Sequence, residues 1–268
     1  MNRVVETFGR LRSEGRRGLA PFLCAGRPGL DRLPELLQGV EEAGASIVEI
    51  GVPFSDPIAD GPVIAAAMHR ALLEGVTPAK ILDALEKARP RTSLALVAMV
   101  SVSIVHRAGA EAFARRAAAA GFDGLIVPDA PVDESGPIRA AADAAGLTLS
   151  LLVAPTTPPD RARRIVEACT GFVYLIARAG ITGERDRAPE IEARVRAIRA
   201  VSDLPIACGF GISSAAQVRD VVRHADAAIV GSALVRRIEA AIESHADPVQ
   251  TARAFVADLA TGLPSAGP

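Results

Sequence analysis

The sequence lacks tryptophan, has one tyrosine, and contains only 3% aromatic residues, so stacking platforms for nucleic-acid bases are not expected. An excess of either charge is also missing, because 30 Lys and Arg residues nearly balance 31 Asp and Glu residues and leave a net charge of -1. Such a balance provides no electrostatic drive toward nucleic acid or an anionic lipid surface. Neither a nucleic-acid partner nor a membrane partner is predicted.

Long hydrophobic runs and paired cysteines are absent as well. No apolar stretch approaches the ~18 residues of a membrane span, and the N-terminal residues carry several arginines without the apolar stretch of a signal peptide. The three cysteines, Cys24, Cys169 and Cys208, are odd in number and far apart, which favours a reducing compartment and offers no zinc-ligand spacing. These features predict a cytoplasmic protein.

Lysine is scarce, since only Lys80 and Lys87 occur among the basic residues. Both lie in the predicted helix 78–88, where a solvated helix face is favoured over the desolvated pocket that a Schiff-base lysine needs. The four histidines form no metal-ligand motif. If the chain makes or breaks carbon–carbon bonds, we expect it to use neither an imine nor a metal.

The sequence does contain a regular alternation of short β-branched apolar runs and Ala- and Leu-rich helical stretches. Eight such alternations favour an α/β fold of the parallel (β/α)₈ (TIM) barrel type, while an open doubly wound sheet is the alternative and lacks its glycine fingerprint. No linker divides residues 1–268, which are predicted to form a single domain with a frayed tail from about 262. The predicted strands span 19–25, 46–51, 94–99, 124–127, 147–153, 172–177, 205–208 and 227–230. The predicted helices include 30–43, 63–73, 78–88, 110–120, 135–145, 160–168, 190–201 and 215–223.

The most informative segment is 47–62, in which a buried strand runs into a loop that holds Asp56 and Asp60. If the valine and isoleucine on either side of Glu49 face the helices, strand alternation points Glu49 into the barrel mouth. An apolar setting there would raise its pKa toward the range useful for proton transfer. A structural glutamate paired with an arginine is the competing interpretation of Glu49, and a helix N-cap is the competing interpretation of Asp60.

Glycine-bearing loops follow the last three predicted strands, at 180–183, 209–214 and 231–233. Glycine lets backbone amides approach an anion, and each loop opens toward a helix N-terminus, whose dipole favours negative charge. Turns need glycine in any case, so the prediction of a phosphate site depends on two adjacent strand ends sharing this pattern. The polar segment 178–189 is predicted to be either a solvated loop or a lid that excludes water.

Taken together, these segments resemble the tryptophan synthase alpha chain, in the right order and over nearly the whole chain. The block Val-Glu-Ile-Gly-Val-Pro-Phe-Ser-Asp-Pro within 47–62 is the most specific. The other matching stretches are Val127-Pro-Asp, Ala154-Pro-Thr-Thr, Gly180-Ile-Thr-Gly, Gly209-Phe-Gly-Ile-Ser and Gly231-Ser-Ala. The resemblance implies a (β/α)₈ lyase that cleaves indole-3-glycerol phosphate to indole and glyceraldehyde 3-phosphate, in the last step of L-tryptophan biosynthesis.

By matching position, the resemblance implies that Glu49 is the general acid/base at the indole ring and the glycerol hydroxyl. It implies that Asp60 accepts the indole N–H and stabilises positive charge on the ring. Phe22 and Tyr174 would line the indole pocket, and Thr182 would steady Asp60. The phosphate would be held by Gly183, Gly211, Gly231 and Ser232.

The resemblance also implies a partner, a separate beta chain that carries pyridoxal phosphate and condenses the indole with serine, in an alpha2beta2 heterotetramer. The chain itself is expected to hold no cofactor and no metal. The family contacts its beta chain through the loops after strands two and three. Two departures from the family stand out: Arg27 occupies a position where an acid is usual, and 99–106 replaces a segment that usually carries a tyrosine and an asparagine.

Two other functions remain open. Another phosphate-binding barrel enzyme, an isomerase or epimerase, would use paired carboxylates or a cysteine and would not need the loop from Asp56 to Asp60. A catalytically weak subunit kept to regulate a beta chain would not need both Glu49 and Asp60. Turnover of indole-3-glycerol phosphate, followed as free indole, separates these possibilities.

Overall fold

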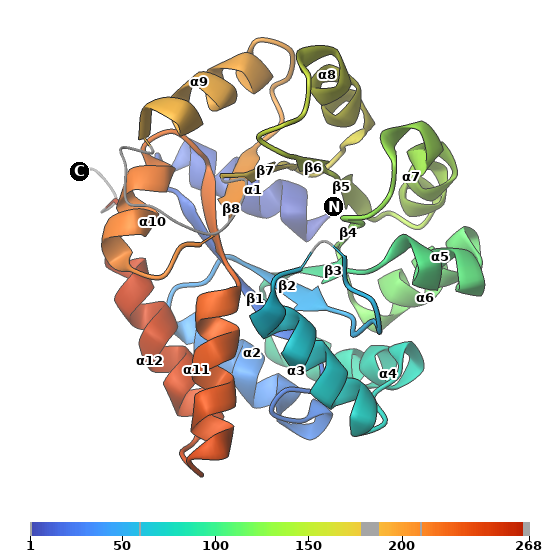
Figure 1. Ribbon diagram of the computed structural model, residues 1–268, viewed down its shortest axis with the longest axis vertical. Coiled ribbons are helices and arrows are strands. Elements are labelled where there is room, and N and C mark those ends of the chain that lie inside the picture. The colour runs from blue at the N-terminus through green and yellow to red at the C-terminus, as the bar shows by residue number, and fades with distance from the viewer. Residues whose placement is uncertain (1, 59, 178–187, 210, 265–268) are drawn as a thin grey trace.

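A computed structural model describes residues 2–58, 60–177, 188–209 and 211–264 (Figure 1). Nine parallel strands lie in one sheet in the order β5-β4-β3-β2-β1-β9-β8-β7-β6, which curves into a nearly closed barrel ringed by helices. The predicted (β/α)₈ barrel is therefore confirmed. The strands are β1 (Gly18–Cys24), β2 (Ile47–Gly51), β3 (Ala95–Met99), β4 (Gly124–Ile126), β5 (Thr148–Ser150), β6 (Leu152–Val153), β7 (Val173–Ile176), β8 (Ile206–Gly209) and β9 (Ala227–Val230).

One predicted strand, 147–153, is divided into two. β5 pairs only with β4 and β6 pairs only with β7, so the chain changes neighbours between them. At the break, the N–H of Leu151 donates to Cys169 Sγ at 3.3 Å rather than to a neighbouring strand. The barrel thus keeps eight strand positions although nine strands are counted.

Most of the predicted helices are present, with ends shifted by a few residues. The helices are α1 (Arg3–Ser13), α2 (Leu33–Glu42), α3 (Pro62–Leu73), α4 (Pro78–Ala88), α5 (Val102–Ala108), α6 (Ala110–Ala120), α7 (Ser135–Ala144), α8 (Pro159–Ala168), α9 (Ala188–Arg199), α10 (Ala215–Val222), α11 (Ser232–Glu243) and α12 (Pro248–Ala260). Short 3₁₀ turns lie at Leu30–Arg32, Arg89–Arg91 and Val132–Glu134, and the first of them replaces the start of the predicted helix 30–43. None of the helices in the described ranges is long and apolar enough to cross a membrane.

The core has two layers, as expected for strands buried on both faces. The outer layer lies between strands and helices and contains Val48 and Ile50 of β2. The inner layer fills the barrel and contains Ile47 of the same strand. This sidedness confirms the alternation predicted for 47–51, with Glu49 on the inward face.

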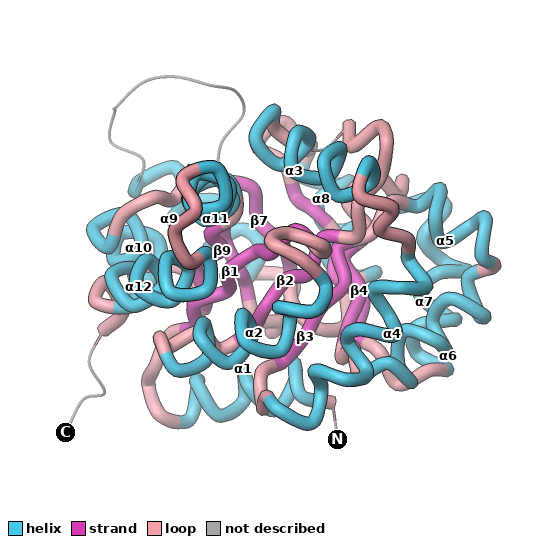
Figure 2. The backbone as a smooth tube through the Cα atoms, turned by 90° about the horizontal axis from the view of Figure 1, so that it is seen from below, coloured by secondary structure: helices cyan, strands magenta, loops and turns pink. Residues whose placement is uncertain are grey.

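The first helix, which the sequence did not predict, closes the amino-terminal end of the barrel (Figure 2). Val4 and Phe8 of α1 belong to the inner layer, and the Phe8 ring lies 5.6 Å from the Phe172 ring. Asn2 caps α1, and its Nδ2 donates to the Asp123 carbonyl at 2.6 Å. The open end of the barrel is therefore the carboxyl end of the strands, where barrel enzymes carry their active sites.

The C-terminal residues that the structure describes are packed on the barrel. Gly262 is buried, and Leu263 packs against the outer core layer. This part of the predicted tail therefore contributes to the fold, whereas 265–268 lie outside the described residues.

Candidate active site

Glu49 is a fully buried carboxyl group on the inward face of β2. It lies in register with Phe22 of β1 and Val97 of β3, and its relative exposure is 0%. Among the described residues, neither of its carboxyl oxygens has a hydrogen-bond partner. The interpretation of Glu49 as the structural partner of an arginine is therefore wrong. Burial raises its pKa well above the usual range, and the charge of Asp60 raises it further.

Asp60 lies in the loop between β2 and α3 and is partly buried. The N-cap of α3 is Gly61, and no side chain makes a cap hydrogen bond there. The interpretation of Asp60 as a helix cap is therefore wrong. Burial raises the pKa of Asp60 to about 6, with the Asp129 charge as the second cause. Two carboxyl groups with raised pKa values thus lie near each other at the mouth of the barrel, and the charge of Asp60 acts on Glu49.

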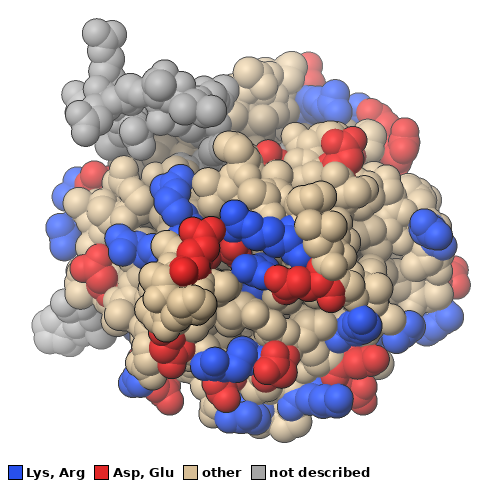
Figure 3. All heavy atoms as spheres, turned by 60° about the horizontal axis from the view of Figure 1, so that its bottom comes forward, with Lys and Arg blue, Asp and Glu red and all other residues tan. Residues whose placement is uncertain are grey.

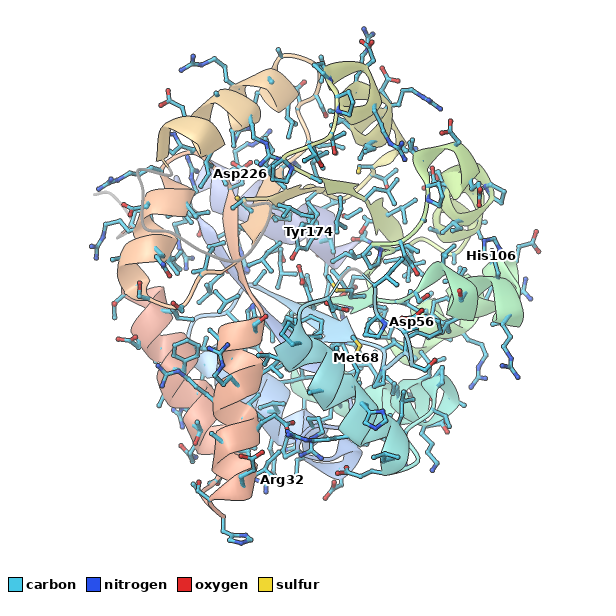
Figure 4. All side chains as sticks on the ribbon, in the orientation of Figure 1. Arg32, Asp56, Met68, His106, Tyr174 and Asp226 are labelled. Atoms are coloured by element: carbon cyan, nitrogen blue, oxygen red, sulfur yellow. The ribbon has the colours of Figure 1, made fainter. Side chains whose placement is uncertain are left out.

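Two aromatic rings line the same interior. Phe22 of β1 is 2% exposed and Tyr174 of β7 is 7% exposed, and both belong to the inner core layer. Figure 4 shows Tyr174 reaching toward the middle of the barrel. Burial raises the pKa of Tyr174 well above its usual range, and the charges of Glu49 and Asp60 raise it further. The structure thus brings together the four pocket residues predicted within the described segments.

Gly51 and Gly209 make room for these rings and were not identified from the sequence as site residues. A Cβ on Gly51 would lie 2.3 Å from Phe22 Cζ, and a Cβ on Gly209 would lie 3.0 Å from Tyr174 Oη. The first contact is closer than packed carbon atoms come, and the second would require the Tyr174 side chain to shift. Their position is the sequence signal that could have identified them, because each glycine is the last residue of its strand.

The predicted anion site is partly described. Ser232 is the first residue of α11 and Gly231 is its N-cap, directly after β9. Gly211 follows the neighbouring strand β8 with a positive φ of 77°, and it is exposed. Backbone amides and a helix N-terminus thus meet at the open end of adjacent strands, which favours a bound phosphate. The predicted residues Thr182 and Gly183 lie outside the described residues.

The unusual Arg27 is held within a network of charges. Its Nε donates to Glu239 Oε1 at 2.7 Å, and its Nη1 pairs with Glu74. Arg70 of α3 also pairs with Glu239, which belongs to α11. Figure 3 shows acidic and basic side chains interspersed over the face that carries α3 and α11. Arg27 therefore ties the loop after β1 to two helices whose N-termini lie at the site.

The altered segment 99–106 is partly a helix rather than the loop expected from the sequence. Ser101 is the N-cap of α5, and its Oγ donates to Asp129 Oδ2 at 2.6 Å. The N–H of Val102 donates to Asp129 Oδ1 at 2.8 Å. Asp129 belongs to the Val127-Pro-Asp motif, but the sequence assigned no role to it.

A groove of about 730 Å³ lies beside the site, between the loop after β2 and helices α4, α5 and α6. Its lining includes Phe54 and Ser55 of that loop together with Ile104 and Arg107 of α5. In Figure 4, His106 of α5 lies on the outer side of the molecule, whereas Asp56 lies near the mouth. The loop after β2 and the segment after β3 thus border one groove.

Other chemistries find little support in the described residues. Both lysines are exposed on α4, as predicted, and no group of three or more His, Cys, Asp and Glu side chains is arranged to hold a metal. The described cysteines are all buried and free. Burial raises the pKa of Cys24 to about 12, with the charge of Glu239 the next cause, which disfavours a thiolate. This weakens the alternative of a cysteine-dependent epimerase.

A parallel barrel with an inward glutamate, an aspartate in the loop that follows it and helix N-termini at the same mouth defines a class, the (β/α)₈ enzymes that combine acid–base chemistry with phosphate binding. The chain belongs to the tryptophan synthase alpha chain family, whose model matches residues 8–263. Curated relatives named tryptophan synthase alpha chain include one from Prochlorococcus marinus, 46% identical over 89% of this chain and 87% of its own length. Another, from Chloroflexus aggregans, is 43% identical over 97% of both chains.

Solved structures agree with this assignment. The tryptophan synthase alpha subunit of Legionella pneumophila superimposes with a TM-score of 0.90 at 31% identity and covers 98% of both chains. A tryptophan synthase chain of Mycobacterium tuberculosis superimposes with a TM-score of 0.87 at 37% identity, covering 97% of this chain and 98% of its own. The chain is accordingly a lyase subunit of tryptophan biosynthesis.

Proposed function

We propose that the chain cleaves indole-3-glycerol phosphate into indole and glyceraldehyde 3-phosphate through the acid–base pair Glu49 and Asp60. The observation that carries this proposal is the buried Glu49 carboxyl group, which has no hydrogen-bond partner within the described residues. Such a group costs folding free energy, so a role in proton transfer accounts for a feature that packing does not.

The cleavage is a retro-aldol reaction and needs two proton movements. Protonated Glu49 donates a proton to the indole carbon that bears the glycerol chain. The resulting carboxylate then takes the proton of the adjacent glycerol hydroxyl as the carbon–carbon bond breaks. The bonding electrons return to the ring, which leaves indole and an aldehyde, and Glu49 is protonated again. The raised pKa of Glu49 supports this role, because it favours the protonated carboxyl group that the first step needs.

Asp60 stabilises the charge that appears on the ring when its carbon is protonated. Its pKa of about 6 leaves it mostly ionised at neutral pH, so it can accept the indole N–H while that nitrogen becomes positive. Phe22 and Tyr174 hold the ring between them, and Thr182 steadies Asp60. The phosphate is bound by the backbone of Gly183, Gly211, Gly231 and Ser232 at the N-terminus of α11.

We propose that the chain, acting as one domain, works in the cytoplasm with a tryptophan synthase beta chain, in an alpha2beta2 heterotetramer. The pyridoxal phosphate of the second reaction belongs to that partner, and the alpha chain carries no cofactor of its own. Family membership and the groove between the loop after β2 and α5 support this partnership. The buried, unpaired cysteines suit a reducing compartment.

Turnover of indole-3-glycerol phosphate by the purified chain, followed as free indole, tests the proposed function. We expect wild-type protein to release indole and Glu49→Gln to lose at least about 10²–10⁴-fold in rate, because the amide keeps the shape but cannot shuttle a proton. Circular dichroism and a thermal melt check that the variant folds. Substantial turnover by folded Glu49→Gln protein would remove Glu49 from its role. A wild-type protein without indole release, alone and with a beta chain, would overturn the function.

A further inference from the structure

Asp129 is a carboxylate that the fold holds in one place beside the active site. Both of its oxygens accept short hydrogen bonds at the start of α5, one from the Ser101 hydroxyl at 2.6 Å and one from the Val102 N–H at 2.8 Å. Asp129 is therefore held in one position on the loop after β4.

Asp60 and Asp129 line the same pocket, together with Met99 and Ser101 of the segment after β3. No hydrogen-bond donor is recorded for the Asp60 side chain among the described residues, whereas Asp129 has two donors. Two carboxyl groups that share a partly buried pocket repel each other when both are charged, so a charge on Asp129 favours the protonated form of Asp60. The geometry thus makes Asp129 a neighbour of Asp60 that is fixed in position.

We propose that Asp129, held by Ser101 and the backbone of α5, is a positioning residue that sets the protonation state of Asp60. Other groups also act on this pocket: Glu49 from β2, Tyr174 from β7 and Cys24 from β1 each experience the charge of Asp60. Of the charged groups in the described residues, Asp129 is the one that acts on Asp60 itself, after burial. It thus tunes the group that stabilises the ring cation.

The inference rests on the proposed role of Asp60, but its first test does not depend on turnover. Carboxyl-labelled aspartate and NMR titration of the free protein would give the pKa of Asp60 directly, with Asp60→Asn used to assign its signal. In Asp129→Asn the side chain keeps its shape, and its amide oxygen still accepts from the backbone N–H of Val102. We expect the Asp60 titration to move to lower pH by about 0.5–1 unit, because a neighbouring negative charge is removed.

Asp133→Asn is the matched control. Asp133 lies on the same connection to α7, but it is exposed and pairs with Arg164 at the surface. The same change of charge there should leave the Asp60 titration within the error of the wild type. Ser101→Ala provides a second variant, because loss of the hydroxyl donor frees one oxygen of Asp129 and should widen or shift the Asp60 titration without a change of charge.

The acid limb of kcat/KM should follow the NMR titration, moving to lower pH in Asp129→Asn and not in Asp133→Asn. An unchanged Asp60 titration in folded Asp129→Asn protein would overturn the inference even if the enzyme releases indole normally. A shifted titration in a protein that releases no indole would instead support the inference and overturn the proposed function. A purely structural role would lower the melting temperature of Asp129→Asn and leave both titrations in place, which also contradicts the inference.

Discussion

Glu49 and Asp60 show how far single residues could be assigned before the structure. Strand alternation predicted the inward direction of Glu49, because a period of two needs only local sequence. The absence of a partner for Glu49 could not be predicted, since the local sequence does not say which distant side chains fold against it. Likewise, Asp60 precedes a helix and resembled a cap until Gly61 was seen to occupy that position.

The raised pKa of Asp60 predicts the acid side of the pH profile. As pH falls through about 6, Asp60 takes up a proton and can no longer stabilise the ring cation, so kcat/KM should fall up to about tenfold per pH unit below that value. The measurement is kcat/KM for indole release between pH 5 and pH 8. The substrate phosphate also titrates near 6, so Asp60→Asn is the necessary comparison. If kcat/KM falls in the same way at acid pH in the wild type and in Asp60→Asn, the fall is due to the substrate phosphate and not to Asp60.

Burial of Glu49 predicts a pH-dependent stability. Its folded pKa lies above the unfolded value of 4.5, so the native state binds the proton more tightly and loses stability as pH rises from 4.5 toward the raised pKa. Glu49→Met removes this loss. We expect the free energy of unfolding of the variant, relative to that of the wild type, to rise by up to about 1.4 kcal/mol per pH unit in that window. Urea unfolding at pH 5 and pH 7 measures this difference. If the two proteins differ in unfolding free energy by the same amount at pH 5 and at pH 7, Glu49 has an ordinary pKa.

At the scale of elements, periodicity identified most strands and helices, because each buried face imposes its own spacing. No range was predicted for α11 or α12, and three further exceptions have particular causes. α1 was missed because its apolar residues Val4, Phe8 and Leu11 are diluted by arginines, and only the barrel end explains their burial. α5 was missed because its N-terminus depends on a distant acceptor, Asp129. The break between β5 and β6 depends on Cys169, and no local pattern announces it.

Strand β2 ends in a glycine that the packing requires. In Gly51→Ala the new Cβ would meet the Phe22 ring, which is enclosed and cannot move freely, so we expect a loss of about 1–3 kcal/mol in stability and a lower indole-release rate. Gly9→Ala is the control, since nothing lies within 4 Å of its new Cβ and alanine is favoured in a helix. Urea unfolding should give opposite signs for the two variants. Unaltered stability in Gly51→Ala would show that Phe22 can reorient without cost.

At the scale of the whole molecule, the two ends of the barrel differ in purpose. α1 and its contacts close the amino-terminal end, whereas the carboxyl end carries the buried acids, the anion site and the groove. Such a division was predictable from the fold class, because barrel active sites lie at the carboxyl ends of strands. The groove could not be predicted from the fold class, because it depends on how α4, α5 and α6 pack beside the loop after β2.

The groove predicts where a beta chain binds. In Ile104→Arg a charge enters its apolar lining, so affinity for a beta chain should fall by about 1–3 kcal/mol, or roughly ten- to a hundredfold, while indole release by the free alpha chain stays unchanged. Val201→Arg, on an apolar groove between α8 and α9, is the control. Calorimetric titration with the beta chain measures both. Equal affinities would place the partner elsewhere.

Tyr174 has a further consequence for the study of this protein. Because the chain contains no tryptophan and a single tyrosine, its intrinsic ultraviolet fluorescence comes almost wholly from one ring. That ring is buried at the centre of the barrel, 7% exposed and beside the reacting acids. Indole absorbs in the range where tyrosine emits, so a bound indole should quench this emission by energy transfer. The native protein therefore carries its own optical reporter of pocket occupancy, with no label and no background from the surface.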